Sequence, residues 1–453
     1  MAPGPGPAAD ATHARRARVV PLPVVQLAYD TLYVLALIVG LPFFLFFLAT
    51  SRRWRAGLGQ RLGGVPRRQG TRPCLWVHGV SVGEVLAAQT LVAEIRDAMP
   101  GWDVAVSTTT RSGQEVARRT FPDLFVFYFP LDFSLSTDRA LDRVRPSAVV
   151  LLELEIWPNF LLSTSRRGIP VFLVNGRITE RSVRGYRWLQ RLIPEPLDRI
   201  GLYCVQTPVY RDRFLALGVP PARVFVTGNM KLDTVGTEGA EALRASISGI
   251  LRLTPGDWVL IAGSTHEGEE QAALAAFRAV AAQDPRARLV LAPRHLERLG
   301  AVEAAVRQAG FRPVRRTALD GAAAGGGAEA VVVLDTMGEL RSVYAAADAV
   351  FVGGSLVPHG GQNVLEPAGL GKPVLTGPHT WNFEEAVETL AAAGGVEVVR
   401  DAAGLREAAL RLHGDRAEAA RRGAAGREAV VKGKGATRRT LDLIRARLEP
   451  AGT

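Results

Sequence analysis

The sequence contains few of the residues from which disulfides and metal sites are built. Its two cysteines, Cys74 and Cys204, lie inside apolar runs and form no CxxC pair. A disulfide framework is therefore excluded, and a reducing compartment is favoured. The seven histidines are scattered without HExxH spacing, so no metal site and no cofactor are expected. RNP-type aromatic motifs and zinc-finger spacings are also missing, which argues against a nucleic-acid partner.

Charge is missing from one long segment near the N-terminus. Residues 31–50 carry no charged side chain, and about 20 apolar residues of helix cross a bilayer core roughly 30 Å thick. This predicts a membrane-anchor helix over residues 24–50. A buried core helix is the alternative, although core helices of this length usually have a polar face.

A basic block follows the apolar segment. Residues 51–78 include seven arginines and no Asp or Glu, in a chain of 453 residues with a net charge of +11. Such a block is expected to lie on an anionic membrane surface. Arg15, Arg16 and Arg18 flank the other end of the apolar segment, so the positive-inside rule favours a cytoplasmic body only slightly.

The rest of the chain alternates short apolar runs with helix-period stretches, the pattern of βαβ units around parallel sheets. The pattern restarts after about residue 234, which predicts an α/β fold of two doubly wound domains, residues 51–235 and 236–453. The expected strands are 74–77, 104–108, 124–127, 148–152, 171–174, 202–205, 224–226, 258–262, 288–292, 330–334, 349–352 and 373–376. The Gly-rich segment 320–330 is expected to be a surface loop, and the charged tail from about residue 405 a mostly solvated helix.

Polar residues cluster where the predicted strands end. Glu84 follows the first strand and opens a helix, so it is either a capping acid or a catalytic base over a substrate cleft. A position near a helix N-terminus predicts an ionised carboxylate, because the helix dipole favours negative charge. Glu155 and Arg177 follow two later strands of the first domain.

The second domain shows a similar cluster. Ser264, Thr265 and His266 lie between a strand and a helix, where free N–H groups would bind a phosphate or the hydroxyls would only cap the helix. Arg294 either offers a planar cation to a bound anion or forms a surface ion pair. The remaining candidates are His295, Gly338, Asn363 and Glu366. Together they outline a nucleotide-phosphate site without a P-loop or GxGxxG motif.

Ten ordered motifs resemble the 3-deoxy-D-manno-oct-2-ulosonic acid (Kdo) transferases of lipopolysaccharide assembly. They are HGVSVGE, STTTRSGQE, ELEIWPN, VNGRITERS, VTGNMKLD, STHEGEE, PRH, DTMGEL, VGGSLVPHGGQNVLEPA and GPHTWNF, between residues 78 and 383. The resemblance implies two Rossmann-like domains of the GT-B type and metal-independent, inverting transfer of Kdo from CMP-Kdo to a lipid A precursor (lipid IVA). It also implies a location at the cytoplasmic face of the cell inner membrane.

The resemblance assigns roles to individual residues. Glu84 matches the proposed catalytic base, and Glu155 and Arg177 match the acceptor side of the first domain. The CMP-binding side of the second domain is matched by Ser264, Thr265, His266, Arg294, His295, Gly338, Asn363 and Glu366. Two alternatives stay open: a GT-B transferase that uses a UDP-sugar and a lipid acceptor, and a membrane-anchored binding protein without catalysis.

Overall fold

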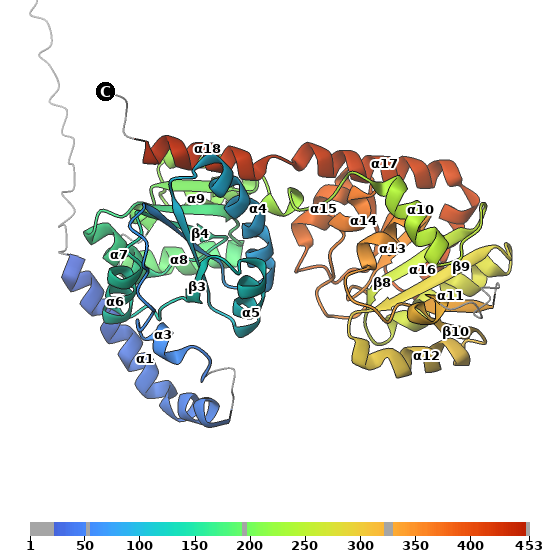
Figure 1. The fold of residues 1–453 in the computed structure, drawn as a ribbon, viewed down its shortest axis with the longest axis horizontal. Helices are drawn as coiled ribbons and strands as arrows, with labels where there is room; N and C mark the ends of the chain where they lie inside the picture. The colour runs from blue at the N-terminus through green and yellow to red at the C-terminus, as the bar shows by residue number, and fades with distance from the viewer. Residues whose placement is uncertain (1–21, 51–54, 193–196, 321–328, 450–453) are drawn as a thin grey trace, which may run out of the picture. The chain divides into compact units, whose positions relative to one another are not determined.

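The structure, a computed structural model, describes residues 22–50, 55–192, 197–320 and 329–449. The predicted loop between residues 321 and 328, and the arginines before residue 22 and at 52 and 53, lie outside these ranges. The chain forms two compact units, residues 1–227 with 440–453, and residues 228–439. Each contains one parallel sheet of seven strands with helices (Figure 1), so the predicted α/β class with two Rossmann-like domains is confirmed.

The first unit has the strand order β3-β2-β1-β4-β5-β6-β7, and every pairing is parallel. The order reverses between β1 and β4, where ligands bind at the carboxyl ends of strands in open α/β sheets. The strands are β1 (Cys74–His78), β2 (Asp103–Thr108), β3 (Phe125–Tyr128), β4 (Ala148–Leu152), β5 (Val171–Gly176), β6 (Leu202–Val205) and β7 (Val224–Val226). The helices are α1 (Leu22–Thr50), α3 (Leu58–Arg61), α4 (Val82–Ala98), α5 (Arg111–Thr120), α6 (Ser134–Val144), α7 (Pro158–Arg166), α8 (Glu180–Leu192) and α9 (Pro208–Leu215).

The second unit has the order β10-β11-β9-β8-β12-β13-β14, again all parallel, with its reversal between β8 and β12. Its strands are β8 (Trp258–Thr265), β9 (Ala287–Pro293), β10 (Arg312–Arg315), β11 (Ala330–Val333), β12 (Ala349–Val352), β13 (Val374–Thr376) and β14 (Val396–Val398). Its helices are α10 (Ala240–Ile250), α11 (Glu269–Ala281), α12 (Leu299–Gln308), α13 (Leu340–Ala346), α14 (Leu365–Gly369), α15 (Glu384–Ala392), α16 (Ala402–Gly414) and α17 (Arg416–Gly433).

Both faces of the second sheet are buried. Along β8, Val259 and Ile261 join one apolar cluster, and Trp258, Leu260 and Ala262 join another. Successive side chains of a strand point to opposite faces, so the two clusters are the two layers between sheet and helices. A continuous apolar run is the expected sequence of such a strand.

The C-terminal helix α18 (Ala436–Leu448) connects back to the first unit, to which residues from Thr440 onward belong. Thr440 hydrogen-bonds Thr227 through their hydroxyl oxygens at 3.1 Å, and Leu441 and Ile444 are fully buried. The tail is helical as expected, but it buries one apolar face. The last residues of the chain therefore belong to the first unit, although they follow the second unit in the sequence.

Helix α1 packs on the first unit along one polar stripe, beside α6 and α7 (Figure 1). Gln26 donates to the Ser163 hydroxyl at 3.0 Å, Asp30 accepts from the Ser134 backbone N–H at 3.0 Å, and the Tyr33 hydroxyl donates to Asp132 at 2.9 Å. Positions 26, 30 and 33 share one face of a helix.

The other faces of α1 are apolar and exposed. Ile38 is 61% exposed and Val39 82%. Within the described residues, one helix is long and apolar enough to cross a membrane, at Pro23–Leu41. Because most of this segment is not buried, α1 is not the buried core helix that was the alternative.

Candidate functional site

Three carboxylates lie at the point where the strand order of the first unit reverses. Glu84 is in the first turn of α4, just after β1, and Glu153 and Glu155 follow β4. β1 and β4 are neighbours in the sheet, with His78 in register with Leu151. The prediction that Glu84 and Glu155 follow strand ends is therefore confirmed, and the topology places those ends side by side.

Glu84 has the geometry of a helix cap. Ser81 is the N-cap of α4, and its hydroxyl accepts from the Glu84 backbone N–H. The Glu84 side chain turns back, with Oε2 accepting from the Val80 backbone N–H and Oε1 from the Ser81 hydroxyl, both at 2.8 Å. A carboxylate has about four acceptor positions, so two of them remain for a substrate.

The pKa of Glu84 is raised above its ordinary value. Burial is the main cause, since 9% of the residue is exposed, and the nearby negative charges of Glu153 and Glu155 add to it. The bonds from Val80 and Ser81 act in the opposite direction but are outweighed. A carboxyl group with a raised pKa is a better proton acceptor when it is ionised.

The other acceptor-side candidates are held by specific partners. Glu155 Oε2 accepts from the Trp157 indole N–H at 2.8 Å. Arg177, which follows β5, lies 3.7 Å from Glu153 Oε2. Glu153 and Asn175 have left-handed backbone conformations, with φ of 57° and 51°. Asparagine adopts this conformation more readily than most residues, but it is unfavourable for a glutamate, and such strained residues gather at functional sites.

The second unit repeats this arrangement at its own reversal point. Ser264, one residue before the end of β8, has a φ of 55°, and the Thr265 hydroxyl donates to Glu270 at 2.9 Å. His266 is almost buried, and its ring stacks on His359 with centroids 4.2 Å apart. Burial lowers the pKa of His266, and the neighbouring His359 lowers it further. A neutral imidazole is therefore favoured at this position.

Glu269 is a residue of this site that the sequence reasoning missed. Its fully buried carboxylate accepts from four backbone N–H groups, those of His266, Gly354, Ser355 and Leu356, at 2.6–2.9 Å. It thereby fixes the loop after β12 against the start of α11. The only signal in the sequence was an acid in the first turn of a helix, which is also the signal of an ordinary cap.

Gly353 shows how closely these segments approach. A Cβ at this position would lie 2.7 Å from both Glu269 Oε2 and the Ser264 carbonyl oxygen. Any other residue would have to push the loop after β12 away from the end of β8. Gly353 therefore serves close packing of backbone, and Gly354 beside it has a left-handed φ of 67°.

The remaining donor-side candidates differ in how firmly they are held. Asn363 donates to Glu366 at 3.1 Å, and burial raises the pKa of Glu366. Arg294 and His295 are exposed, and the Arg294 side chain makes no hydrogen bond or ion pair with the described part of the chain. The His295 ring lies 5.6 Å from that of His266.

Gly338 lies in the turn before α13 and has a φ of 87°. Nearby, Asp335 accepts from Thr317, and the Thr336 hydroxyl donates to Glu339 at 2.6 Å. No side chain caps α13. No described contact joins Gly338 to the other donor-side residues.

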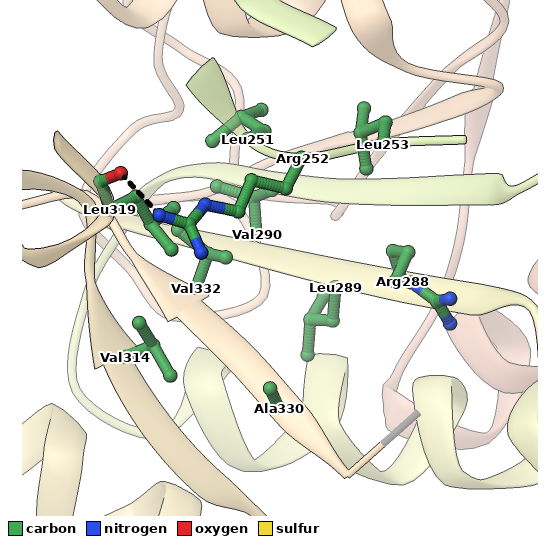
Figure 2. Close-up of a pocket in the computed structure, with 10 residues that line it drawn as sticks. All are labelled: Leu251, Arg252, Leu253, Arg288, Leu289, Val290, Val314, Leu319, Ala330 and Val332. Carbon is green, nitrogen blue, oxygen red and sulfur yellow. Dashed lines mark hydrogen bonds between the residues drawn. The ribbon is translucent and has the colours of Figure 1, made fainter. Parts of the chain in front are cut away.

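A small cavity in the second unit lies elsewhere (Figure 2). It is lined mostly by aliphatic side chains, including Leu289, Val314 and Val332, and the Arg252 guanidinium donates to the Leu319 carbonyl beside it. Its volume of about 20 Å³ holds roughly one water molecule. It is therefore far too small for a nucleotide.

Sequence comparison finds close relatives over most of the chain. A family profile described as 3-deoxy-D-manno-octulosonic-acid transferase (kdotransferase) matches residues 56–234. The 3-deoxy-D-manno-octulosonic acid transferase of Haemophilus influenzae is 34% identical over 92% of this chain and 98% of its own length. That of Bordetella pertussis is 35% identical over 82% of this chain and 86% of its own length.

Structural comparison identifies the fold. A glycosyltransferase from Rickettsia africae matches with a TM-score of 0.57 at 11% identity, over 84% of this chain and all of that one. UDP-GlcNAc 2-epimerase from Neisseria meningitidis matches with a TM-score of 0.56 at 15% identity, over 83% of this chain and all of that one. At such identities the likeness extends to the GT-B-like fold alone, which hosts both transferases and epimerases.

Proposed function

This chain belongs to the Kdo transferase family, a family of glycosyltransferases of lipopolysaccharide synthesis, and we propose that it moves Kdo from CMP-Kdo to a lipid A precursor by inverting, metal-independent transfer. The observation that carries the proposal is the cluster of the buried Glu84 with the partly buried Glu153 and Glu155 at the reversal point of the first sheet. Transfer requires a base for the acceptor hydroxyl, and no metal ion is needed for that step.

In the proposed reaction the acceptor hydroxyl gives its proton to Glu84 and bonds to the anomeric carbon of Kdo. The bond from that carbon to the phosphate oxygen breaks, and CMP leaves with the electron pair. Glu84 suits the role of base because burial raises its pKa and two of its acceptor positions are free. Glu155 and Arg177 orient the acceptor.

Negative charge that develops on the departing phosphate requires cations and N–H donors. Arg294 is exposed and without a protein partner among the described residues, so its guanidinium is available to an anion. Ser264, Thr265 and His266 stand beside it, because the Arg294 backbone N–H donates to the Thr265 carbonyl at 3.0 Å. His295, Gly338, Asn363 and Glu366 complete the proposed donor side.

The proposed place of the reaction is the cytoplasmic face of the inner membrane. The exposed apolar side chains of α1 would enter the bilayer, and its polar stripe at Gln26, Asp30 and Tyr33 holds the first unit at the lipid surface. A lipid acceptor would then reach the first unit without leaving the membrane. The exposed arginines that follow α1, namely Arg55, Arg67 and Arg72, would contact anionic headgroups. Arg68 does not take part, because it is buried and paired with Asp103 at 2.6 Å.

The test uses the purified full-length chain with CMP-Kdo and the lipid acceptor, and mass analysis of the product. Glu84→Gln preserves shape and hydrogen-bonding capacity but removes the base. We expect turnover to fall by roughly 10²–10⁴-fold with donor affinity unchanged. Glu115→Gln is the control, because Glu115 lies on exposed α5 in a surface ion pair with Arg111.

Near-wild-type turnover in a folded Glu84→Gln chain would show that Glu84 is only a cap. Competition by free nucleotides separates the donor classes. Inhibition by CMP and not UDP supports a CMP-sugar, and the reverse would favour a UDP-sugar transferase. Absence of any transfer by the wild-type chain would favour a binding protein.

A further inference from the structure

Helix α1 packs on the first unit along its first part and is exposed along the rest. Over residues 25–33 one face of the helix is buried or partly buried, and Asp30 accepts from the Asn159 side-chain amide at 2.8 Å. Between residues 34 and 46, those residues whose exposure the structure describes are exposed apart from Gly40. They are apolar, with Ile38 61% and Phe43 72% exposed. Figure 1 shows the C-terminal end of α1 well away from α6 and α7.

The chain returns to the first unit soon after α1 ends. On α3, the Gln60 side-chain oxygen accepts from the Tyr128 backbone N–H at 2.9 Å. The Leu131 backbone N–H donates to the Arg61 carbonyl at 2.7 Å. Gly57 lies so close to the Tyr128 ring that a Cβ on it would be 2.0 Å away. The return is therefore fixed by direct packing.

Both ends of the apolar part of α1 contact the same connection, residues 128–134 between β3 and α6. At the start of the apolar part, the Tyr33 hydroxyl donates to Asp132 at 2.9 Å, and the Tyr33 and Phe133 rings are 5.7 Å apart. After α1 ends, Tyr128 and Leu131 of this connection bind α3. Two points held by one short connection lie on the same side of a membrane.

Length and charge also argue against a crossing. At 1.5 Å per residue, residues 34–50 form about 25 Å of helix, which is less than the roughly 30 Å of a hydrocarbon core. A crossing would leave residues 51–57, with the sequence SRRWRAG, to bring the chain back. They reach about 25 Å even when fully extended. An extended return would leave backbone polar groups unsatisfied in lipid, and the three arginines make it more unfavourable.

We propose that α1 is a one-sided anchor: its apolar residues 34–50 enter the leaflet that faces the first unit, and the chain leaves the membrane on the same side. The exposed apolar side chains are thus covered by the acyl chains of a single leaflet. The inference deepens the proposed membrane location and rests on it, but it does not depend on Kdo transfer.

The anchor is attached at the edge of the sheet that holds the carboxylate cluster. Residues 128–134 follow β3, Glu84 follows β1, and Glu153 follows β4. Because all these strands are parallel, their carboxyl ends lie at one edge. A one-sided anchor therefore keeps this edge beside the leaflet from which a lipid acceptor is drawn.

Single cysteines report the side of the membrane on which each end of α1 lies. Ala11→Cys precedes α1, Arg55→Cys follows it, and Glu115→Cys on the exposed face of α5 is the matched reference for the first unit. Cys74 and Cys204 are buried, so the wild-type chain gives the background. A thiol reagent that does not cross membranes is applied to sealed spheroplasts and to inverted inner-membrane vesicles.

We expect all three cysteines to be labelled in inverted vesicles and protected in spheroplasts. Labelling of any two of them from opposite sides would show that α1 crosses the bilayer and would overturn the proposal. Labelling of all three only in spheroplasts would contradict the proposed cytoplasmic location and still support a one-sided anchor. The readout does not involve transfer, so a failure of the proposed reaction is seen separately.

The second test separates insertion from attachment at the surface. Ile38→Cys on α1 and Val209→Cys on α9 replace apolar residues of similar exposure, 61% and 56%. Each full-length variant carries a fluorophore on the new cysteine and is mixed with vesicles whose lipids bear bromine on their acyl chains. We expect quenching at residue 38 and none at residue 209. Equal fluorescence at the two positions would show that acyl chains do not cover α1 and would overturn the proposal.

Discussion

The four backbone N–H groups bound by Glu269 give a quantitative prediction for Glu269→Gln. A glutamine retains one acceptor oxygen, so two of the four bonds are lost and an NH₂ group faces two N–H donors. A hydrogen bond to a charged group contributes about 1.5–3 kcal/mol, so the loss is roughly 3–6 kcal/mol. Native domains are stable by about 5–15 kcal/mol, and the variant therefore approaches the limit of folding.

The assay is thermal and denaturant unfolding of the full-length chain. The transition of the second unit is identified as the one that added nucleotide shifts to a higher midpoint. For a domain of about 200 residues, 1 kcal/mol corresponds to roughly 2–4 °C, so the unfolding transition should fall by about 6–24 °C. Glu267→Gln is the control, because Glu267 lies two residues away and is exposed. Equal transitions in the two variants would refute the view that Glu269 holds the loop after β12.

Three further outcomes are expected. Burial raises the pKa of Glu84, and the base must be ionised to act. We therefore expect kcat/KM to fall as the pH decreases, with a midpoint above about 4.3, the ordinary pKa of a glutamate. An acid limb that persists in Glu84→Gln would belong to another group. Arg294→Lys, which loses the planar fork, should raise donor KM and spare acceptor KM, and unchanged donor kinetics would remove Arg294 from the donor side. Val39→Lys on α1 should lower the membrane-bound fraction, whereas Leu135→Lys on α6 should not; equal partition would show that α1 does not enter the bilayer.

Most of the fold could be predicted because its strands are buried on both faces. The twelve predicted strands are all present, several with the same limits, because a continuous apolar run between helix-period stretches is a strong signal. β10 and β14 were missed. Both are short edge strands, and β10 contains two arginines and a proline around a single buried residue, Val314. The edge strands β3 and β7 were predicted, because their sequences FVFY and VFV are continuous apolar runs.

The site could be predicted as a set of strand ends but not as a set of contacts. The order of the strands decides which ends are neighbours, and nothing in the local pattern of residues 74–84 or 148–155 states that β1 pairs with β4. The raised pKa of Glu84 could not be predicted from the local sequence for a related reason. The helix dipole is a local feature of the sequence, whereas burial and the charges of Glu153 and Glu155 depend on the whole sheet.

The two units place a glutamate at the same topological position and use it differently. Glu84 and Glu269 both lie in the first turn of the helix that follows the strand at the reversal point. Glu269 fills all four acceptor positions with backbone N–H groups, so it has no capacity left for a ligand and its role is to hold two segments together. Glu84 fills two, one of them with a hydroxyl that can rotate away. Exchange of carboxylate for amide should therefore separate the two roles. Glu269→Gln should lower the melting temperature more than it lowers turnover. Glu84→Gln should lower turnover in a chain that melts near the wild-type temperature. The same loss in both variants would mean that the number of occupied acceptor positions does not distinguish a base from a structural acid in this fold.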